Sequence, residues 1–269
     1  MSDIPPAMLE SIQDTLTVDA LMTEREQLVT ISQTEDPSTV QEKVRELEIN
    51  QVPVMGDDSV AGLMIADPKD RTLPKTGNYE QIAPRWLVSA DTPIRRLIDI
   101  LDGDQHPARF VFQEDRVVGL VTYADLNDAV ARTTLYLLVS QLEIELARLL
   151  KRHREDSWSY VKHLSEKRQK DITAKSYRAT ENDVKNDLIQ LFYLTDLFKA
   201  IRSESVLLEQ LGFPSKNQFD NATSGINKMR RDIAHSVRLV VDSVEGVSSV
   251  NRRCKRIEEL LNRIASYRS

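Results

Sequence analysis

Residues 110–126 read FVFQEDRVVGLVTYADL and decide the fold of the first half of the chain. Apolar and β-branched residues predict short strands over 110–112 and 117–122, and the polar residues between them predict a tight turn. The residues that follow predict that a helix begins at Ala124 and continues to Ala131. The stretch therefore predicts a strand, a turn, a second strand and a helix.

The same order occurs earlier in the chain, which indicates an internal repeat. A predicted helix over 40–47 precedes two short apolar runs at 52–55 and 60–65, and a Gly-Asp-Asp turn separates these runs. Repeats of this length pack against each other, because each alone has a thin core. We expect an α+β module made of β-α-β-β-α repeats. The two repeats span about 16–70 and 85–132.

The second half of the chain has a different pattern. Apolar residues recur at helical spacing, and few turn signals interrupt them. The predicted helices cover 135–154, 161–172, 184–201, 219–241 and 252–267. A Gly-Phe-Pro sequence breaks the pattern at 212–214, and Ser215 after it is a predicted N-cap. We expect an all-α helical bundle over 133–269, separate from the α+β module over 1–132.

Composition separates the two halves as well. Residues 1–132 contain 12 Lys and Arg against 24 Asp and Glu, whereas residues 133–269 contain 24 against 18. The basic half is therefore suited to a phosphate backbone, although long surface helices are also commonly rich in Lys and Arg. Cys254 is the only cysteine, which excludes an internal disulfide and a thiolate metal cluster. No signal peptide or membrane-spanning stretch is recognised, so we expect a cytoplasmic protein without a membrane partner.

The first candidate site is Gly119-x-x-Thr122-x-x-Asp125, at the end of the second strand of the second repeat. A helix beginning here would offer unpaired N–H groups to a phosphate, and the Asp125 carboxylate would accept hydrogen bonds from ribose hydroxyls. The alternative is a capping role, in which Asp125 satisfies the backbone of its own helix.

This motif resembles the signature of CBS domains, and the tandem repeat strengthens the resemblance. The resemblance implies a pseudo-symmetric pair of CBS domains that binds an adenine nucleotide, AMP or ATP, as a regulatory ligand. Thr122 and Asp125 would contact phosphate and ribose, and Thr92, in the Asp-Thr-Pro that precedes the helix of the second repeat, would join them. In the first repeat Ile65 and Pro68 stand where Thr122 and Asp125 stand in the second. We therefore expect one competent nucleotide site per chain.

The second candidate site is Met-Arg-Arg-Asp-Ile-Ala-His at 229–235. A histidine can transfer protons near neutral pH, and a guanidinium can hold a phosphodiester in a two-point contact. In an ideal helix Arg230 and His235 are offset by roughly 140°, so they converge only if the helix bends or ends between them, or if a second chain supplies one partner. The alternative is that both side chains are simply solvated.

The Arg-x-x-x-x-His spacing resembles the signature of HEPN domains, helical bundles that include dimeric ribonucleases of toxin and antiviral systems. The resemblance implies that Arg230 and His235 are the catalytic pair, that RNA is the substrate and that the chain is a homodimer. No zinc-ligand spacing is present, so we expect no metal. The family usually has Asn, Asp or another small polar residue after the arginine, whereas this chain has Arg231.

Two functional hypotheses follow from these motifs. The first is a nucleotide-regulated, metal-independent endoribonuclease. The second is a non-catalytic nucleotide sensor or adaptor, whose helical domain mediates dimerisation and partner binding. Arg231 favours the second hypothesis, and the basic charge of the helical half favours the first.

Overall fold

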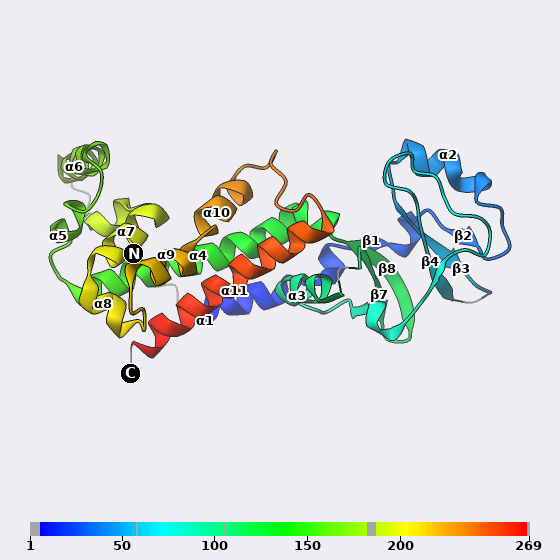
Figure 1. The fold of residues 1–269 in the computed structure, drawn as a ribbon, viewed down its shortest axis with the longest axis horizontal. Coiled ribbons are helices and arrows are strands. Elements are labelled where there is room, and N and C mark those ends of the chain that lie inside the picture. Colours follow the sequence, from blue (N-terminus) through cyan, green and yellow to red (C-terminus); the bar gives the residue numbers. More distant parts are fainter. Residues whose placement is uncertain (1–5, 58, 105, 182–186, 268–269) are drawn as a thin grey trace. The chain divides into compact units, whose positions relative to one another are not determined.

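The computed structural model describes residues 6–57, 59–104, 106–181 and 187–267, and the chain folds as two compact units (Figure 1). We call them the sheet unit and the helical unit. The sheet unit consists of Ser11–Thr134 and Val241–Ser248. The helical unit consists of Met1–Glu10, Leu135–Val240 and Ser249–Ser269. A short segment near the C-terminal end of the sequence therefore belongs to the sheet unit.

The first sheet of the sheet unit has the strand order β2-β3-β4-β5. Its strands are β2 (Ile31–Ser32), β3 (Gln51–Met55), β4 (Val60–Ile65) and β5 (Glu80–Gln81). β2 runs parallel to β3, and β3 and β4 form an antiparallel hairpin in which Val54 lies opposite Gly62. Helix α2 (Ser38–Glu46) buries Val44 in a core cluster that includes Val52 and Val54.

The second sheet has the order β1-β8-β7-β6 and the same plan. Its strands are β1 (Thr23–Glu24), β6 (Leu87–Ser89), β7 (Ala108–Gln113) and β8 (Arg116–Thr122), with helix α3 (Ile94–Asp104) preceding β7. β6 runs parallel to β7, and Val111 lies opposite Gly119 in the β7–β8 hairpin. The edge strands are exchanged: β1, which precedes β2, pairs with β8, and β5 pairs with β4. The strands expected over 52–55, 60–65, 110–112 and 117–122 are thereby confirmed.

Two equivalent glycines permit the exchanged edge strands to approach closely. A Cβ on Gly119 would lie 2.6 Å from the carbonyl oxygen of Thr23 in β1, and one on Gly62 would lie 2.1 Å from that of Glu80 in β5. Both contacts are with backbone atoms, which cannot rotate away as a side chain does. The glycine of the Gly119 motif therefore has a packing role of its own.

Replacing Gly119 with alanine is expected to lower the free energy of unfolding by about 1–3 kcal/mol, because the added methyl group overpacks the β1–β8 contact. Urea unfolding followed by circular dichroism measures this change. The matched control is Gly103→Ala in helix α3, where a Cβ meets nothing within 4 Å. That variant is expected to gain roughly 0.5–1 kcal/mol from helix propensity. Equal stability of the two variants would contradict this account of the glycine.

The helical unit is built from helices of very different lengths, and helices α1, α4 and α11 have residues in both units. The helices are α1 (Pro6–Thr15), α4 (Ala129–His153), α5 (Trp158–Val161), α6 (Glu166–Glu181), α7 (Leu194–Ser203), α8 (Ser205–Gln210), α9 (Lys216–Thr223), α10 (Ile226–Ala234) and α11 (Val244–Ser266). The 3-10 turns are η1 (Val18–Ala20), η2 (Arg25–Gln27), η3 (Pro84–Trp86), η4 (Ala124–Asn127) and η5 (Leu188–Leu191). The Ser215 side chain accepts a hydrogen bond from the Gln218 N–H, which confirms the predicted cap.

Several helix bounds expected from the sequence are wrong. The helix expected over 219–241 is two helices, because Gly225 adopts a left-handed conformation (φ 82°) between α9 and α10, and the chain leaves α10 at Ala234. The helix expected from Ala124 is the short turn η4, and α4 begins at Ala129. The helix expected over 161–172 begins later, at Glu166. Part of the helix expected over 184–201 falls outside the described residues.

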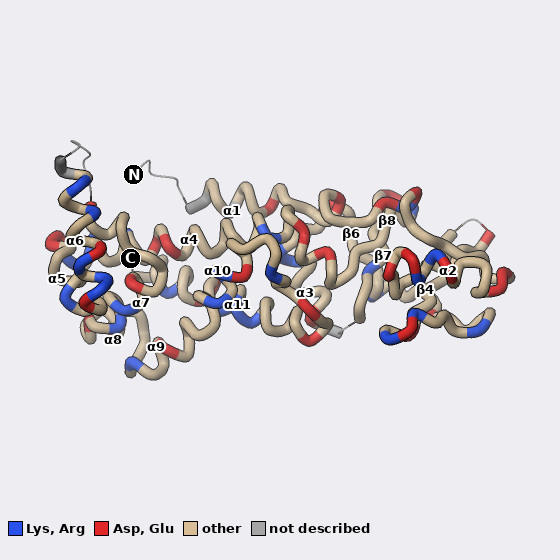
Figure 2. The backbone as a smooth tube through the Cα atoms, turned by 90° about the horizontal axis from the view of Figure 1, so that it is seen from above, with Lys and Arg blue, Asp and Glu red and all other residues tan. Residues whose placement is uncertain are grey.

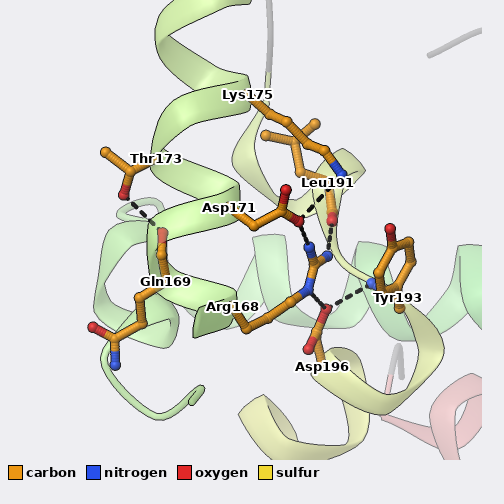
Figure 3. Close-up of polar contacts among 8 residues, drawn as sticks. All are labelled: Arg168, Gln169, Asp171, Thr173, Lys175, Leu191, Tyr193 and Asp196. Atoms are coloured by element: carbon orange, nitrogen blue, oxygen red, sulfur yellow. Dashed lines mark hydrogen bonds and ion pairs between the residues drawn. The ribbon is translucent and has the colours of Figure 1, made fainter. Parts of the chain in front are cut away.

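A network around Arg168 fixes helix α6 to the segment that leads into α7 (Figure 3). The guanidinium donates from Nε to the Asp196 carboxylate at 2.7 Å, pairs with Asp171, and donates to the carbonyl oxygen of Leu191. Its Cζ atom lies over the Tyr193 ring, 4.0 Å from the ring centre. Asp196 also accepts from the Tyr193 N–H at 2.9 Å and thereby caps α7. This arginine is used for packing, since its donors and its face are engaged within the helical unit.

Candidate functional site

A cleft of about 300 Å³ lies in the sheet unit where the two sheets contribute neighbouring loops. Residues 27–29 and 47–51, on either side of α2, line it together with 122–125 at the end of β8. Thr23 of β1 and Leu120 of β8 also contribute to the lining. Apolar side chains such as Val29 and Ile49 share the lining with polar ones such as Thr122 and Asp125, the combination that small-molecule sites use for burial and orientation.

The structure brings Thr122 and Asp125 together in this cleft. Thr122 is the last residue of β8, and Asp125 lies in the turn η4. The Oδ2 atom of Asp125 accepts hydrogen bonds from the Thr122 N–H at 2.6 Å and from the Thr122 hydroxyl at 3.0 Å. Within the described part of the chain, Oδ1 accepts none. Asp125 therefore caps its own turn with one oxygen and keeps the other available to a ligand.

The electrostatic state of Asp125 is consistent with a binding role. Burial raises the pKa of its carboxyl group above the ordinary value, although the two hydrogen bonds from Thr122 act in the opposite direction. A partly desolvated carboxylate gains more from a hydroxyl donor than one in water does, because the local dielectric is lower. Since η4 is only four residues long and α4 starts beyond it, the helix N-terminus expected at Ala124 is not present there.

Thr92 lies elsewhere in the sheet unit, just before α3. Its N–H donates to the Ser89 carbonyl oxygen, and its carbonyl oxygen accepts from the Val18 N–H, both at 3.0 Å. Thr92 is not among the described residues that line the cleft. The structure therefore groups Thr122 with Asp125 and leaves Thr92 apart from them.

The equivalent position in the other half of the sheet unit is filled by aromatic rings. Matching the Val54–Gly62 pair to the Val111–Gly119 pair makes Trp86 the counterpart of Val29 and His106 the counterpart of Ile49. The Trp86 and His106 rings stack with their centroids 4.5 Å apart and their planes at 22°.

Further contacts hold this stack in place. His106 Nε2 lies 3.2 Å from the carboxylate of Glu80, which is the counterpart of Thr23. The Arg85 guanidinium lies 5.7 Å from the Trp86 ring centre. Trp86 is buried. The cleft is open between Val29 and Ile49. At the equivalent position in the other half of the sheet unit, which we call the second position, the side chains of Trp86 and His106 fill this space.

The Arg-x-x-x-x-His motif lies at the end of helix α10 in the helical unit. The helix ends at Ala234, and His235 has an extended backbone (φ −108°, ψ 99°) with an exposed side chain. Arg230, in the last helical turns, donates from Nε to a Glu143 carboxylate oxygen of α4 at 2.7 Å. The helix thus ends between Arg230 and His235, which is one of the conditions for their convergence.

Other charged residues surround the motif. Asp232 is buried and pairs with Lys228 at 2.7 Å and with Arg238 at 3.7 Å, whereas Arg231 is exposed. Helix α11 carries a basic run that consists of Arg252, Arg253, Lys255 and Arg256, and Figure 2 shows blue segments along this helix. Arg256 of this run donates to the carbonyl oxygen of Ser224, just before α10. The motif is therefore flanked by cations, with Glu143 and Asp232 as local acidic partners.

Sequence reasoning missed three features of these sites. Glu143 is separated from Arg230 by 87 residues, so no local pattern announces their contact. Trp86 and His106 would have been found by extending the repeat alignment to the residues that precede β6 and β7. The contact of Asn127 with Val241 has no signal in the sequence, because the two residues are 114 positions apart.

A comparison with protein-family models finds a match within the sheet unit. A family model for the CBS domain matches residues 85–132, which include Thr122 and Asp125. CBS domains are nucleotide-binding regulatory modules, and the match covers one of the two sequence repeats. No curated protein matches the chain.

Three solved structures illustrate the likeness. The CBS domain of a bacterial CNNM/CorC family Mg²⁺ transporter in complex with ATP is 18% identical, with a TM-score of 0.37, over 47% of this chain and 94% of its own. CBSX2 in complex with AMP is 18% identical, with a TM-score of 0.35, over 44% and 96%. A hemolysin-like CBS protein of Oenococcus oeni PSU is 14% identical, with a TM-score of 0.35, over 45% and 93%.

Two further observations concern membranes and metals. None of the described helices combines the length and the apolar character that crossing a lipid bilayer requires. Among the described residues, no three His, Cys, Asp or Glu side chains gather as ligands of a metal ion would.

Proposed function

We propose that the sheet unit is a tandem CBS pair that binds one adenine nucleotide per chain, AMP or ATP, and regulates the helical unit. The observation that carries this proposal is the cleft in which Asp125 and Thr122 meet an apolar wall formed by Val29 and Ile49. The adenine ring would pack against the apolar wall, which removes apolar surface from water. The ribose hydroxyls would donate to Asp125, and the Thr122 hydroxyl would turn toward phosphate or ribose.

The proposed stoichiometry follows from the filled second position. Ile65 and Pro68 replace the polar pair there, and the Trp86–His106 stack occupies the space between the walls. Isothermal titration calorimetry with AMP and, separately, with ATP is expected to give about one site per chain for the nucleotide that binds.

A substitution at Trp86 tests whether removal of the stack alone creates a second nucleotide site. Trp86→Val, which restores the residue type of Val29, removes the stack but supplies no acceptor for ribose. It is expected to leave the stoichiometry at one. Two sites of equal affinity in the wild-type chain would overturn the assignment, and heat-silent titrations with both nucleotides would overturn the sensor itself.

We further propose that the helical unit is a metal-independent endoribonuclease and that the protein acts as a cytoplasmic homodimer. The observation that favours cleavage is the end of α10 at Ala234, which places His235 beyond the helical repeat while Arg230 is bonded to Glu143 within it. His235 is exposed and Arg230 is half-buried, and in a symmetric homodimer the motifs of both protomers would face one shared cleft.

The proposed reaction uses only groups of the chain and of the RNA. His235 takes the proton of a ribose 2′-hydroxyl, whose oxygen attacks the adjacent phosphorus. The bond from phosphorus to the 5′-oxygen breaks, and the departing oxygen is protonated by an imidazolium or by water. Arg230 holds the phosphate in a two-point contact, and Glu143 orients the guanidinium. The products are a 2′,3′-cyclic phosphate and a free 5′-hydroxyl.

The competing function is that of a non-catalytic adaptor, which the exposed Arg231 favours. A purified wild-type sample incubated with single-stranded RNA, in EDTA and with or without AMP and ATP, tests the two functions. Cleavage to cyclic-phosphate ends supports the ribonuclease. Intact RNA under all conditions, together with nucleotide binding by calorimetry, supports the adaptor.

A further inference from the structure

The chain that follows the Arg–His motif at 229–235 enters the sheet unit at Val241. Residues 236–240 lead from His235 to Val241, and Val241–Ser248 belongs to the sheet unit. Val241 is almost fully buried, whereas Val237 and Leu239 before it are exposed. Ser248, at the other end of this segment, donates to the Asp102 carboxylate of α3. The segment Val241–Ser248 is therefore fixed at both of its ends within the sheet unit.

One side chain satisfies both backbone polar groups of Val241. The Val241 N–H donates to Asn127 Oδ1 at 3.0 Å, and Asn127 Nδ2 donates to the Val241 carbonyl oxygen at 2.7 Å. The same Nδ2 group also lies 3.1 Å from the carbonyl oxygen of Ala124. Because a buried backbone group without a partner is costly, Val241 is expected to follow Asn127 when Asn127 moves.

Asn127 lies on the same short turn as the proposed ribose ligand. The turn η4 contains Asp125 and Asn127 with the buried Leu126 between them, and the Asp128 N–H donates to the Asp125 carbonyl oxygen at 3.0 Å. At one end of this turn Asp125 is bonded to Thr122, and at the other end Asn127 is bonded to Val241. A ligand that draws Asp125 away from Thr122 would therefore displace the whole turn.

We infer that Asn127 is a positioning residue that transmits the nucleotide state of the cleft to the segment after His235. This inference rests on the proposed function, since it gives the regulation of the same two sites. The nucleotide changes the hydrogen bonds of Asp125, η4 shifts, and Val241 shifts with it, only six residues beyond His235. A ligand regulates only through differential contacts with two states. Here the ribose would donate to Asp125, and the Thr122 hydroxyl would give up its bond to Asp125 when it turns toward the nucleotide.

Hydrogen–deuterium exchange of the full-length chain tests the inference without requiring cleavage. Saturating AMP, and ATP in a parallel sample, are expected to change exchange in peptides covering 120–126 and 236–243 together. In Asn127→Ala the nucleotide still binds by calorimetry and 120–126 still responds, but 236–243 does not. Asn217→Ala in α9 is the matched control. It removes an exposed amide for whose side chain the described structure gives no hydrogen bond, and it is expected to respond as the wild type does.

The rate of RNA cleavage provides a second readout. We expect the nucleotide to change the wild-type rate on the order of 5-fold or more, within the usual range of allosteric coupling, and to change the Asn127→Ala rate hardly at all. Asn127→Asp keeps an acceptor for the Val241 N–H and loses the donor to its carbonyl, so it should retain part of the response.

The possible failures are distinguishable. If neither nucleotide binds, the sensor proposal and this inference fall together. If a nucleotide binds to the wild type and changes exchange in 120–126 but not in 236–243, the inference alone is overturned. A full response of 236–243 in Asn127→Ala also overturns it. Exchange that behaves as expected while RNA stays intact would retain the coupling and remove only the ribonuclease.

Discussion

Replacing His235 with alanine is expected to lower the rate of RNA cleavage by about 10²–10⁴-fold, because the reaction loses the group that moves the proton of the attacking hydroxyl. The side chain is exposed beyond the end of α10, so the substitution removes little packing, and the fold should be retained. Single-turnover cleavage of a labelled RNA measures the effect, with circular dichroism as the check on folding. The products should carry 2′,3′-cyclic phosphate ends, and EDTA should leave the wild-type rate unchanged.

The control for this experiment is His163→Ala, which removes an exposed histidine of the same unit. It should cleave at the wild-type rate. Arg230→Lys should recover little of the activity lost in Arg230→Ala, since an ammonium group does not reproduce the two-point contact of a guanidinium. Undiminished cleavage by the His235→Ala protein would point to a contaminating nuclease and would contradict the catalytic assignment.

Replacing Asp125 with alanine is expected to weaken adenine-nucleotide binding by about 10–150-fold, which corresponds to the ~1.5–3 kcal/mol of a hydrogen bond to a charged group. The ribose hydroxyls would lose their acceptor, and Thr122 would lose the partner of both its N–H and its hydroxyl. Calorimetry measures the change in affinity. Asp115→Ala, an exposed aspartate in the β7–β8 turn, is the matched control and should bind as the wild type does. Unchanged affinity in Asp125→Ala would place the nucleotide elsewhere.

The pH dependence of binding gives a second check on Asp125. The ionised carboxylate accepts hydrogen bonds from the ribose, and the protonated form accepts them poorly. Affinity should therefore fall as the pH drops through the pKa of the free site. Because burial raises this pKa, the loss should begin at a higher pH than for an ordinary aspartate, whose pKa is about 3.9. The Asp125→Ala protein should not show this loss.

The parts of the fold that the sequence predicts well are those with local signals. The strands of both hairpins follow from β-branched runs beside turn residues, and the Thr122–Asp125 contact joins residues only three positions apart. The long helix expected over 219–241 was wrong, because a single glycine at 225 and the residues after Ala234 outweigh an apolar periodicity that continues past them. Helical spacing alone does not report such an interruption.

The parts that could not be predicted depend on contacts between distant segments. The Arg230–Glu143 pair and the Asn127–Val241 bonds each join residues that no periodicity connects. The sequence contains the side chains but not their neighbours, because packing of separate elements decides which groups meet. For the same reason, nothing in the sequence marks Val241–Ser248 as a part of the sheet unit.

The filled second position has a consequence for how the chain would respond to a mixture of nucleotides. A protein with two open clefts can hold AMP in one and ATP in the other, so it registers both concentrations at once. With the Trp86–His106 stack in place, AMP and ATP would compete for the single cleft of the proposed sensor. Occupancy by one then depends on the concentration of the other, weighted by their affinities. At saturating total nucleotide, such a chain follows the ratio of AMP to ATP and is indifferent to their sum.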